Sequence, residues 1–320
     1  MTKPRVVFLD RATIPSQISL KPLSFEHDWV EYDFTQPNQV AQRVKEADIV
    51  ITNKVVLNAA NLSQATQLRF IAVSATGVNN IDLEYCQSNA ISVSNIQGYA
   101  TQSVPEHVIA MLFALKRNLK GYHQDIEDDV WQRDKQFCFF THPIQDIAGS
   151  TLGVIGSGSL GQATAALAKA IGMNVIFAER KGKSQCREGY MTFEEVLKAA
   201  DAISLHCPLT TQTENMLSSA EFQMMKSNCV VINAGRGGLV DEEALVDALR
   251  SGEIAGAGVD VFTEEPADRS NPLLANSELP NLLLTPHVAW GSDTAIQKLA
   301  DILMYNIEAF VAGDRQNSVV

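Results

Sequence analysis

The sequence predicts an α/β protein in which two doubly wound parallel sheets form separate domains. Short apolar runs alternate with amphipathic, helix-like segments, and this alternation is typical of parallel strands joined by crossover helices. A chain of 320 residues exceeds what one hydrophobic core usually supports, which favours two domains of roughly 100–200 residues each. The pattern begins anew near Leu152. The runs expected to form strands are residues 6–9, 49–52, 70–74, 152–155, 175–178, 202–205, 230–233, 257–261 and 282–285.

Composition disfavours several classes of protein. The net charge of −12 makes the surface repel phosphate backbones and anionic lipids, so neither nucleic acid nor membrane is expected as a partner. No apolar run approaches the ~20 residues of a membrane span, and the first run resembles no secretory signal, so we expect a cytoplasmic protein. The five cysteines lack a CxxC pair, which supports neither a disulfide framework nor a metal site.

Two helical segments and one aromatic segment decide the expected domain organisation. Residues 110–119 are expected to form a helix that passes from one domain into the other, and residues 295–311 a helix that returns to the first. The first domain is then built from both ends of the chain. Aromatic residues among charges at 121–143 fit neither core pattern. They indicate either contact with a partner subunit or a surface loop packed on its own domain, and the sequence does not separate these alternatives.

A glycine-rich turn follows the strand predicted at residues 152–155. It reads Gly-Ser-Gly-Ser-Leu-Gly from Gly156 to Gly161 and precedes a helix-forming stretch. Gly156 suits the tight turn, Gly158 allows a pyrophosphate to approach the backbone, and Gly161 allows helix and strand to pack closely. The free N–H groups and the dipole of the helix then favour the negative charge of the pyrophosphate. The motif predicts a Rossmann-type dinucleotide site.

The end of the next strand bears on which dinucleotide binds. Glu179 lies about 20 residues after the glycine turn, where an acidic side chain accepts hydrogen bonds from the adenosine ribose. A carboxylate there disfavours a 2′-phosphate, so NAD is preferred over NADP. Arg180, Lys181 and Lys183 follow directly and argue the other way, since cations accommodate that phosphate. A glycine turn of another α/β protein, with Glu179 merely solvated, is the alternative.

Three polar residues follow the ends of later predicted strands, where ligands bind in open parallel sheets. They are Arg236, Glu265 and His287. Reduction of a 2-oxo acid needs a cation for the carboxylate, a general acid for the carbonyl oxygen, and a group that orients this acid. A guanidinium binds a carboxylate as a fork, an imidazole transfers protons near neutral pH, and a carboxylate stabilises an imidazolium. Each residue also has an ordinary interpretation as a surface ion pair, a solvated loop acid or a turn residue.

The chain resembles the D-isomer-specific 2-hydroxyacid dehydrogenases, and among them the glycerate dehydrogenases, also called hydroxypyruvate reductases. The glycine loop and six further motifs carry the resemblance. These motifs are Ala75-Thr-Gly-Val-Asn-Asn-Ile-Asp, Asn95-Ile-Gln-Gly-Tyr-Ala-Thr-Gln-Ser-Val-Pro-Glu-His, His206-Cys-Pro-Leu-Thr, Asn233-Ala-Gly-Arg-Gly, Gly258-Val-Asp-Val-Phe and Thr285-Pro-His-Val-Ala-Trp.

The resemblance implies a flavodoxin-like catalytic domain from residues 1–99 and 288–320, and an inserted NAD-binding domain over 100–287. It also implies a homodimer in which an arm at about 121–143 embraces the partner. Arg236 binds substrate and polarises the carbonyl, Glu265 pairs with the histidine, and His287 donates the proton. The residues expected to contact the cofactor are Thr101, Gly156, Gly158, Ser159, Leu160, Gly161, Glu179, Arg180, Cys207, Pro208, Thr213, Ala234, Arg236 and Asp260, and those expected to bind substrate are Thr76, Gly77, Val78, Arg236 and His287.

The expected activity is NAD(H)-dependent hydride transfer between nicotinamide C4 and C2 of a short 2-oxo or 2-hydroxy acid, without a metal. Hydroxypyruvate and D-glycerate are the leading pair, and glyoxylate or another 2-oxo acid is the nearest competitor. Phosphoglycerate is disfavoured because no added basic cluster lies near residues 75–78 and no regulatory domain is expected after Val320. An NADH-sensing binding protein without turnover is the alternative from another class, and the full Arg, Glu and His set argues against it.

Overall fold

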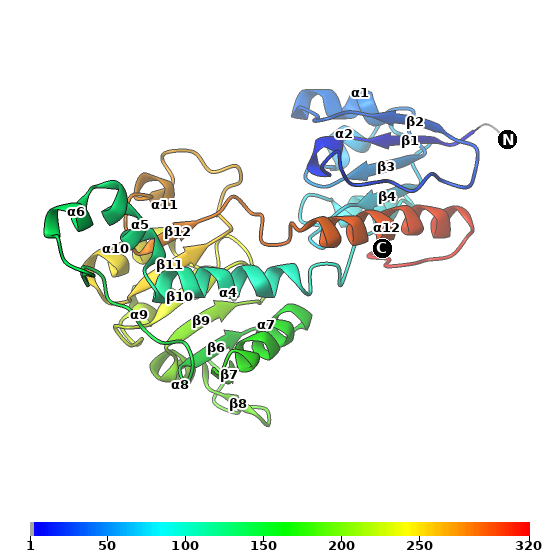
Figure 1. The fold of residues 1–320 in the computed structure, drawn as a ribbon. Coiled ribbons are helices and arrows are strands. Elements are labelled where there is room, and N and C mark those ends of the chain that lie inside the picture. Colours follow the sequence, from blue (N-terminus) through cyan, green and yellow to red (C-terminus); the bar gives the residue numbers. More distant parts are fainter. Residues whose placement is uncertain (1–2) are drawn as a thin grey trace. The chain divides into compact units, whose positions relative to one another are not determined.

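The computed structural model describes residues 3–320, which form two compact units (Figure 1). The first unit contains the residues up to Tyr99 together with Gly291–Val320, and the second is Ala100–Trp290. The return to the first domain was predicted at residue 288, whereas the units divide between Trp290 and Gly291. Both ends of the chain therefore fold together.

The first unit is built on a five-stranded parallel sheet. Its order β2-β1-β3-β4-β5 is the order of flavodoxin-like sheets, in agreement with the predicted fold class. Two of the central strands, β3 and β4, are buried along their whole length, as continuous apolar runs of parallel sheets are. The strands are β1 (Arg5–Phe8), β2 (Asp28–Glu31), β3 (Ile49–Thr52), β4 (Phe70–Val73) and β5 (Ser92–Ser94).

Helix α12 (Asp293–Val311) is the C-terminal contribution to the first unit. It packs against β4, where the rings of Phe70 and Phe310 stack at 4.3 Å between centroids. Ser292 caps its first turn by accepting from the N–H of Ala295. No helix within residues 3–320 combines the length and the apolar character of a membrane span. The other helical segments of this unit are η1 (Arg11–Thr13), η2 (Pro37–Gln39), α1 (Val40–Val44), α2 (Ala59–Leu62) and α3 (Leu83–Ser88).

The second unit is built on a seven-stranded parallel sheet with the order β12-β11-β10-β9-β6-β7-β8. The chain runs outward from β6 in one direction and then returns to β9 and continues in the other. The order therefore reverses between β6 and β9, which is the switch point at which doubly wound sheets bind ligands. The strands are β6 (Thr151–Ile155), β7 (Asn174–Ala178), β8 (Tyr190–Met191), β9 (Ala202–Leu205), β10 (Val230–Asn233), β11 (Gly256–Val259) and β12 (Leu282–Leu284).

Helices cover both faces of this second sheet. One face packs against α4 and α7, and the opposite face buries the apolar side chains of α8, α9 and α10. The helix expected at residues 110–119 begins earlier and lies wholly in the second unit, so the expectation that it passes between domains was wrong. The apolar face of this helix, α4, packs against α7 and the sheet. The helices are α4 (Ser103–Lys116), α5 (Leu119–Glu127), α6 (Val130–Asp134), α7 (Ser159–Ala170), α8 (Phe193–Ala199), α9 (Ser219–Phe222), α10 (Glu242–Ser251) and α11 (Pro272–Ala275).

Three strands were not expected from the sequence: β2, β5 and β8. They lie at the edges of their sheets and are only partly buried or very short. An edge strand has one neighbour and keeps polar residues, so its sequence lacks the continuous apolar run that identified the central strands.

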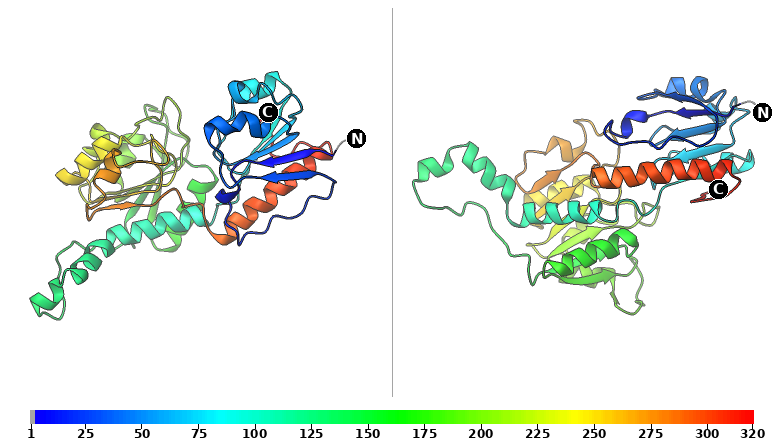
Figure 2. Two further views of the ribbon diagram at one scale, coloured as in Figure 1. Left: turned by 90° about the horizontal axis from the view of Figure 1, so that it is seen from above. Right: turned by 45° about the vertical axis from the view of Figure 1, so that its right-hand side comes forward.

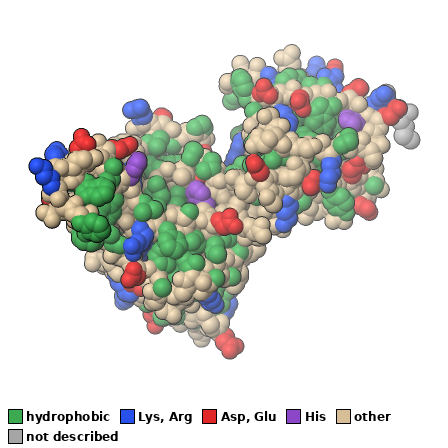
Figure 3. All heavy atoms as spheres, viewed as in Figure 1, with side chains coloured by type: hydrophobic (Ala, Val, Ile, Leu, Met, Phe, Trp, Pro, Cys, Tyr) green, Lys and Arg blue, Asp and Glu red, His purple; other side chains and the backbone are tan. Residues whose placement is uncertain are grey.

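The arm at about residues 121–143 contains most of α5 and all of α6. Figure 2 shows these helices continuing beyond the end of α4, away from the sheet of the same unit. Hydrophobic side chains gather at this end of the unit (Figure 3), and Trp131, Phe137 and Phe140 are 45%, 93% and 78% exposed. The arm is held together locally, since the Tyr122 hydroxyl donates to the carbonyl of His142 at 2.6 Å. Its aromatic side chains do not pack into the core of their own unit.

Candidate active site

The predicted dinucleotide loop lies at the switch point of the second sheet. Gly156 follows β6 with a positive φ of 99°, and a Cβ there would lie 2.5 Å from the carbonyl carbon of His206, in the turn after β9. A Cβ at Gly161 would lie 2.0 Å from the carbonyl oxygen of Gly156. Any larger residue would separate these turns, whereas a Cβ at Gly158 would meet open space. The loop is thus tight where protein meets protein and open where a ligand would approach.

Helix α7 begins directly behind this loop. Gly158 is its N-cap, and no side chain caps the first turn. The N–H groups at a helix start have no partner within the helix, and together with the helix dipole they attract an anion. Ser159, Leu160 and Gly161, which were predicted to contact the cofactor, form this first turn.

Glu179 directly follows β7 and is only 7% exposed. Its carboxylate accepts two hydrogen bonds from the Arg187 guanidinium, at 2.7 and 3.1 Å, and one from the N–H of Arg180 at 2.9 Å. The hydrogen bonds from Arg187 lower the pKa of Glu179 to about 2. Arg187 was not predicted from the sequence, because no motif links a residue eight positions later in a loop to the strand end.

The three predicted catalytic residues follow three neighbouring strands. Arg236 lies after β10, Glu265 after β11 and His287 after β12, and these strands are adjacent and parallel. Their carboxyl ends therefore meet at one edge of the sheet, the edge that also holds the glycine loop after β6.

A hydrogen bond joins Glu265 and His287. The Nδ1 atom of His287 lies 2.6 Å from Oε2 of Glu265, with both side chains less than one-third exposed. The other carboxylate oxygen accepts from the N–H of Phe262 at 3.0 Å, which fixes the orientation of the acid. Glu265 in turn fixes the imidazole, so Nε2 is the ring nitrogen left for a substrate.

Arg236 lies in a turn that touches the Glu265 loop. Its backbone carbonyl accepts from the Asn233 side chain at 2.9 Å, and its guanidinium donates to the carbonyl of Gly235 at 2.7 Å. A Cβ on Gly237 would lie 1.8 Å from the carbonyl oxygen of Phe262. Glycine at this position therefore allows the turn after β10 to press against the residues after β11. The chain of contacts runs from Arg236 through Phe262 to Glu265 and His287.

Asp260 holds the backbone on both sides of His287. It is fully buried, and its carboxylate accepts from the Thr285 hydroxyl and from the N–H groups of Val288 and Ala289, at 2.5, 2.9 and 2.9 Å. Its carbonyl accepts from the N–H of His287 at 2.7 Å. His287 has a φ of +56°, a left-handed conformation that is unfavourable for a residue with a side chain. The Asp260 contacts maintain that conformation.

Replacing Asp260 by alanine is therefore expected to lower the free energy of unfolding by about 2–4 kcal/mol, because buried N–H donors lose their charged acceptor. Asp260→Asn keeps one acceptor oxygen and should cost less. Chemical denaturation measures both changes. Equal stability of wild type and Asp260→Ala would contradict the supporting role of this carboxylate.

His107, on α4, is a residue of this site that was not predicted from the sequence. Its Nε2 atom lies 3.0 Å from the Thr285 hydroxyl and 3.8 Å from Asp260. The Pro-Glu-His motif that contains it carried the resemblance, so a signal existed. The contact fixes α4 to the loop that carries His287.

Three further residues predicted to contact the cofactor lie in the segment after β9: Cys207, Pro208 and Thr213. The Thr213 hydroxyl donates to the carbonyl of Pro208 at 2.7 Å, and Cys207 lies with its sulfur 3.6 Å from that of Met216. Burial raises the pKa of the Cys207 thiol to about 11, so it stays protonated near neutral pH and is no nucleophile. Ala234 is buried in the turn before Arg236, and Thr101 precedes α4.

The predicted substrate-binding residues Thr76, Gly77 and Val78 belong to the first unit, where they follow β4. The Thr76 hydroxyl donates to the carbonyl of Ile96 at 2.7 Å, and the Thr76 carbonyl accepts from the side chain of Asn95 at 2.8 Å. The backbone N–H groups of these three residues have no acceptor within residues 3–320. They remain available to a ligand, as the prediction of carboxylate binding requires.

His206 is partly buried beside the glycine loop. Its Nε2 atom lies 2.8 Å from the Ser204 hydroxyl, while Nδ1 is inaccessible to solvent and has no partner within the described residues. Burial lowers the pKa of His206 to about 4 from 6.5. The folded protein therefore keeps this imidazole neutral over a range in which the unfolded chain protonates it.

The stability of the wild type is expected to fall, relative to His206→Gln, as the pH decreases from about 6.5 to about 4. Because the pKa of His206 is depressed in the folded protein, the stabilisation is fully present above the unfolded-state pKa of 6.5. It is lost as the pH falls from that value toward 4, and the loss of free energy of unfolding reaches about 3 kcal/mol. Urea unfolding of both proteins across this pH range measures the difference. A difference that does not change with pH would contradict the prediction.

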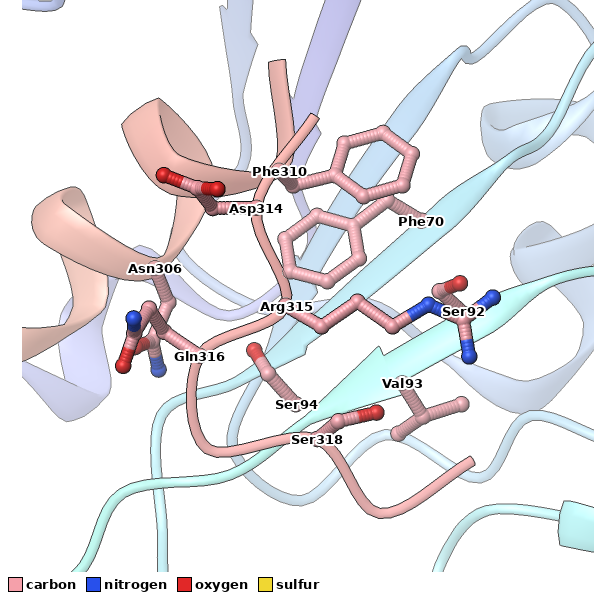
Figure 4. A pocket seen from close by; sticks show the side chains of 10 residues that line it. All are labelled: Phe70, Ser92, Val93, Ser94, Asn306, Phe310, Asp314, Arg315, Gln316 and Ser318. Atoms are coloured by element: carbon pink, nitrogen blue, oxygen red, sulfur yellow. The ribbon is translucent and has the colours of Figure 1, made fainter. Parts of the chain in front are cut away.

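A small cavity lies in the first unit, beside β4, β5 and the end of α12 (Figure 4). Its volume of about 10 Å³ admits roughly one water molecule. No predicted site residue lines it. Nor do three His, Cys, Asp or Glu side chains within residues 3–320 come together as metal ligands do. The lining residues are Phe70, Ser92, Val93, Ser94, Asn306, Phe310, Asp314, Arg315, Gln316 and Ser318.

Comparison with known proteins places this site in a family. Residues 109–289 match the family model described as the NAD binding domain of D-isomer specific 2-hydroxyacid dehydrogenases. The chain belongs to this family. Its members are NAD-dependent oxidoreductases that act on a CH–OH group, so the predictions of family, fold class, enzyme class and NAD as cofactor are confirmed.

Relatives match this dehydrogenase over its whole length. A putative 2-hydroxyacid dehydrogenase of Haemophilus influenzae is 49% identical over 96% of this chain and 98% of its own. A glycerate dehydrogenase of Methylorubrum extorquens is 44% identical over 100% of this chain and 99% of its own. A crystal structure of a Thermus thermophilus protein has a TM-score of 0.81 at 31% identity and covers 99% of this chain and 100% of that one.

Proposed function

We propose that this dehydrogenase interconverts hydroxypyruvate and D-glycerate with NAD(H), and that Arg236, Glu265 and His287 perform the chemistry. The hydrogen bond of 2.6 Å between His287 and Glu265 is the observation that carries the proposal. It pairs a proton donor with an orienting acid at the sheet edge where Arg236 and the glycine loop also lie. These are the parts that reduction of a 2-oxo acid requires.

The residues present fit a dinucleotide. The space above Gly158 and the uncapped start of α7 suit a pyrophosphate, and the turn after β9 lies beside them. Bound NADH supplies the hydride that C2 of the substrate accepts. The buried residues of this edge exclude water and hold the loops that carry the side chains.

Each catalytic side chain then has one task. The Arg236 guanidinium binds the substrate carboxylate and polarises the carbonyl, since a guanidinium fork matches such groups. The Nε2 atom of His287 gives a proton to the carbonyl oxygen as C2 receives the hydride, and takes it back in the reverse reaction. Glu265 orients the imidazole and stabilises it once it is charged. In the first unit, the backbone N–H groups of Thr76 to Val78, which have no acceptor within residues 3–320, are proposed to bind the substrate carboxylate.

The choice of hydroxypyruvate rests on the glycerate dehydrogenase at 44% identity. Trp290, the last residue of the Thr-Pro-His-Val-Ala-Trp motif, donates from its indole N–H to the carbonyl of His287 at 3.0 Å. Glyoxylate is the nearest competitor because it differs only in lacking the hydroxymethyl group. A pocket discriminates weakly against a missing small group, by roughly 10–200-fold for one methylene.

The decisive experiment is NADH oxidation with a panel of 2-oxo acids: hydroxypyruvate, glyoxylate, pyruvate and 3-phosphohydroxypyruvate. We expect the largest kcat/KM with hydroxypyruvate, and chiral analysis should identify the product as D-glycerate. A larger value with glyoxylate would replace the proposed substrate. NADH binding without turnover of any acid would favour the NADH-sensing alternative.

We further propose that the protein is a homodimer joined through the arm. Exposed aromatic side chains such as Phe137 and Phe140 are enriched where subunits meet. Sedimentation velocity should give about twice the mass of one chain, and the Phe137→Ser and Phe140→Ser double variant should shift the protein toward monomer. A monomeric wild type at micromolar concentration would refute the dimer.

We also propose a cytoplasmic location. All five cysteines are free, and Cys86 and Cys229 are buried as small hydrophobic residues. Free thiols of this kind are typical of a reducing compartment. Fractionation of the source cells tests the location.

A further inference from the structure

The carboxylate of Glu179 is saturated with hydrogen bonds. Besides the two bonds from the Arg187 side chain and the one from the N–H of Arg180, it accepts from the N–H of Arg187 at 3.3 Å. A carboxylate offers about four lone-pair positions, and four N–H donors occupy them here. Glu179 therefore has no acceptor left for the adenosine ribose hydroxyls unless Arg187 withdraws.

Arg187 also removes the negative charge that would repel a 2′-phosphate. Its fork binds both oxygens of Glu179, and it stacks on Tyr190 with 3.9 Å from the guanidinium carbon to the ring centroid. The charge of the acid and that of the guanidinium cancel locally. A free acid at this strand end discriminates against NADP, but a neutralised one does not.

Arg187 is able to exchange partners, because its side chain is 56% exposed. The carboxylate offers the guanidinium one negative charge, whereas a phosphate monoester carries close to two at neutral pH and accepts the same fork. The exposed Arg180 and Lys183 lie in the same loop, and neither forms an ion pair within residues 3–320. Three cations are thus available beside one neutralised acid, in a chain that is acidic overall.

We propose that Arg187 is the coenzyme-selecting residue of this enzyme: its guanidinium masks Glu179, binds the 2′-phosphate of NADP(H), and makes the enzyme accept both coenzymes. The inference rests on the proposed function only in that the glycine loop binds a dinucleotide; it does not depend on which 2-oxo acid is reduced. Glu179 has the opposite effect, since it competes with the phosphate for the same guanidinium.

The test is calorimetric binding of two fragments to the whole enzyme without substrate. The fragments 5′-AMP and 2′,5′-ADP share the adenosine and the 5′-phosphate and differ only in the 2′-phosphate. We expect the wild type to bind 2′,5′-ADP at least about tenfold more tightly, because charge-assisted bonds to a guanidinium contribute that much or more. Titration of NADH and NADPH by nucleotide fluorescence should show both binding.

Variants assign the effect to Arg187. Arg187→Ala should weaken 2′,5′-ADP by about tenfold or more while 5′-AMP keeps its affinity or gains, because Glu179 is then free to accept from the ribose. Arg187→Lys, which keeps the charge but not the fork, should lie between. Glu179→Gln should strengthen 2′,5′-ADP alone. Arg69→Ala is the matched control: Arg69 is 60% exposed, pairs with Asp48 at 3.4 Å and lies in the first unit, and its loss should change neither affinity.

Two results would overturn the inference. One is a wild type that binds 5′-AMP more tightly than 2′,5′-ADP. The other is an Arg187→Ala variant that folds, by circular dichroism, and loses affinity for both fragments equally, or for neither. A failure of the proposed substrate would appear instead in the 2-oxo acid panel and would leave these affinities unchanged. If neither fragment bound, the nucleotide site itself would be absent and this inference would fall with it.

Discussion

Replacing His287 by alanine is expected to lower kcat for hydroxypyruvate reduction by roughly 10²–10⁴-fold, the range in which general acid catalysis contributes. NADH should bind as it does to the wild type, since Glu265 holds the imidazole and Asp260 holds the backbone of His287, and neither contact involves the glycine loop. Stopped-flow reduction measures the chemical step, and a fluorescence titration measures the cofactor.

A histidine outside the site provides the control for this variant. His27, in the first unit, uses Nδ1 to contact the carbonyl of Phe25 at 2.8 Å, and His27→Ala should keep the wild-type kcat. Unchanged turnover of His287→Ala would discard the proton-donor assignment. A loss of NADH affinity equal to the loss of turnover would instead mean that the loop after β12 had collapsed.

Replacing Arg236 by alanine is expected to lower kcat/KM for hydroxypyruvate by roughly 10²–10⁴-fold, because a charge-assisted fork to the substrate carboxylate is lost. Arg236→Lys keeps the charge but not the planar fork, so it should recover part of the loss. Steady-state kinetics with both variants separate KM from kcat.

The Arg236 turn itself does not depend on the guanidinium, because the Asn233 side chain binds its backbone and Gly237 packs on Phe262. Thermal unfolding of Arg236→Ala should therefore occur close to the wild-type temperature. A large loss of stability, or a kcat/KM unchanged in both variants, would contradict the assignment of Arg236 to substrate.

The sheets were predictable because parallel strands buried on both faces must be continuously apolar. β3, β4, β6, β9 and β10 lie at the predicted runs for this reason. The edge strands β2 and β8 were not predictable from the sequence. They are only partly buried, so they keep polar residues and lack a continuous apolar run. The start of α4 was misjudged because Pro105 is tolerated in a first helical turn.

The candidate site likewise contains some features that were predictable from the sequence and others that were not. The glycine loop was predictable because a tight turn and a close approach of backbones require glycine, whatever surrounds them. The bond from Arg187 to Glu179 was not, because loop residues pair by position in space and no periodicity records it. His107 and Asp260 likewise act through contacts between elements far apart in the chain.

By itself the sequence determined the α/β class, the glycine turn, the acid at the end of β7 and the polar residues after β10, β11 and β12, because residue type and local spacing carry these features. The family resemblance implied that Glu265 pairs with His287, but only the tertiary structure gave the contact of 2.6 Å between them and the binding of Arg187 to Glu179. Such pairings depend on strand order and loop packing, which bring together residues whose separation in the chain says nothing about their distance in space.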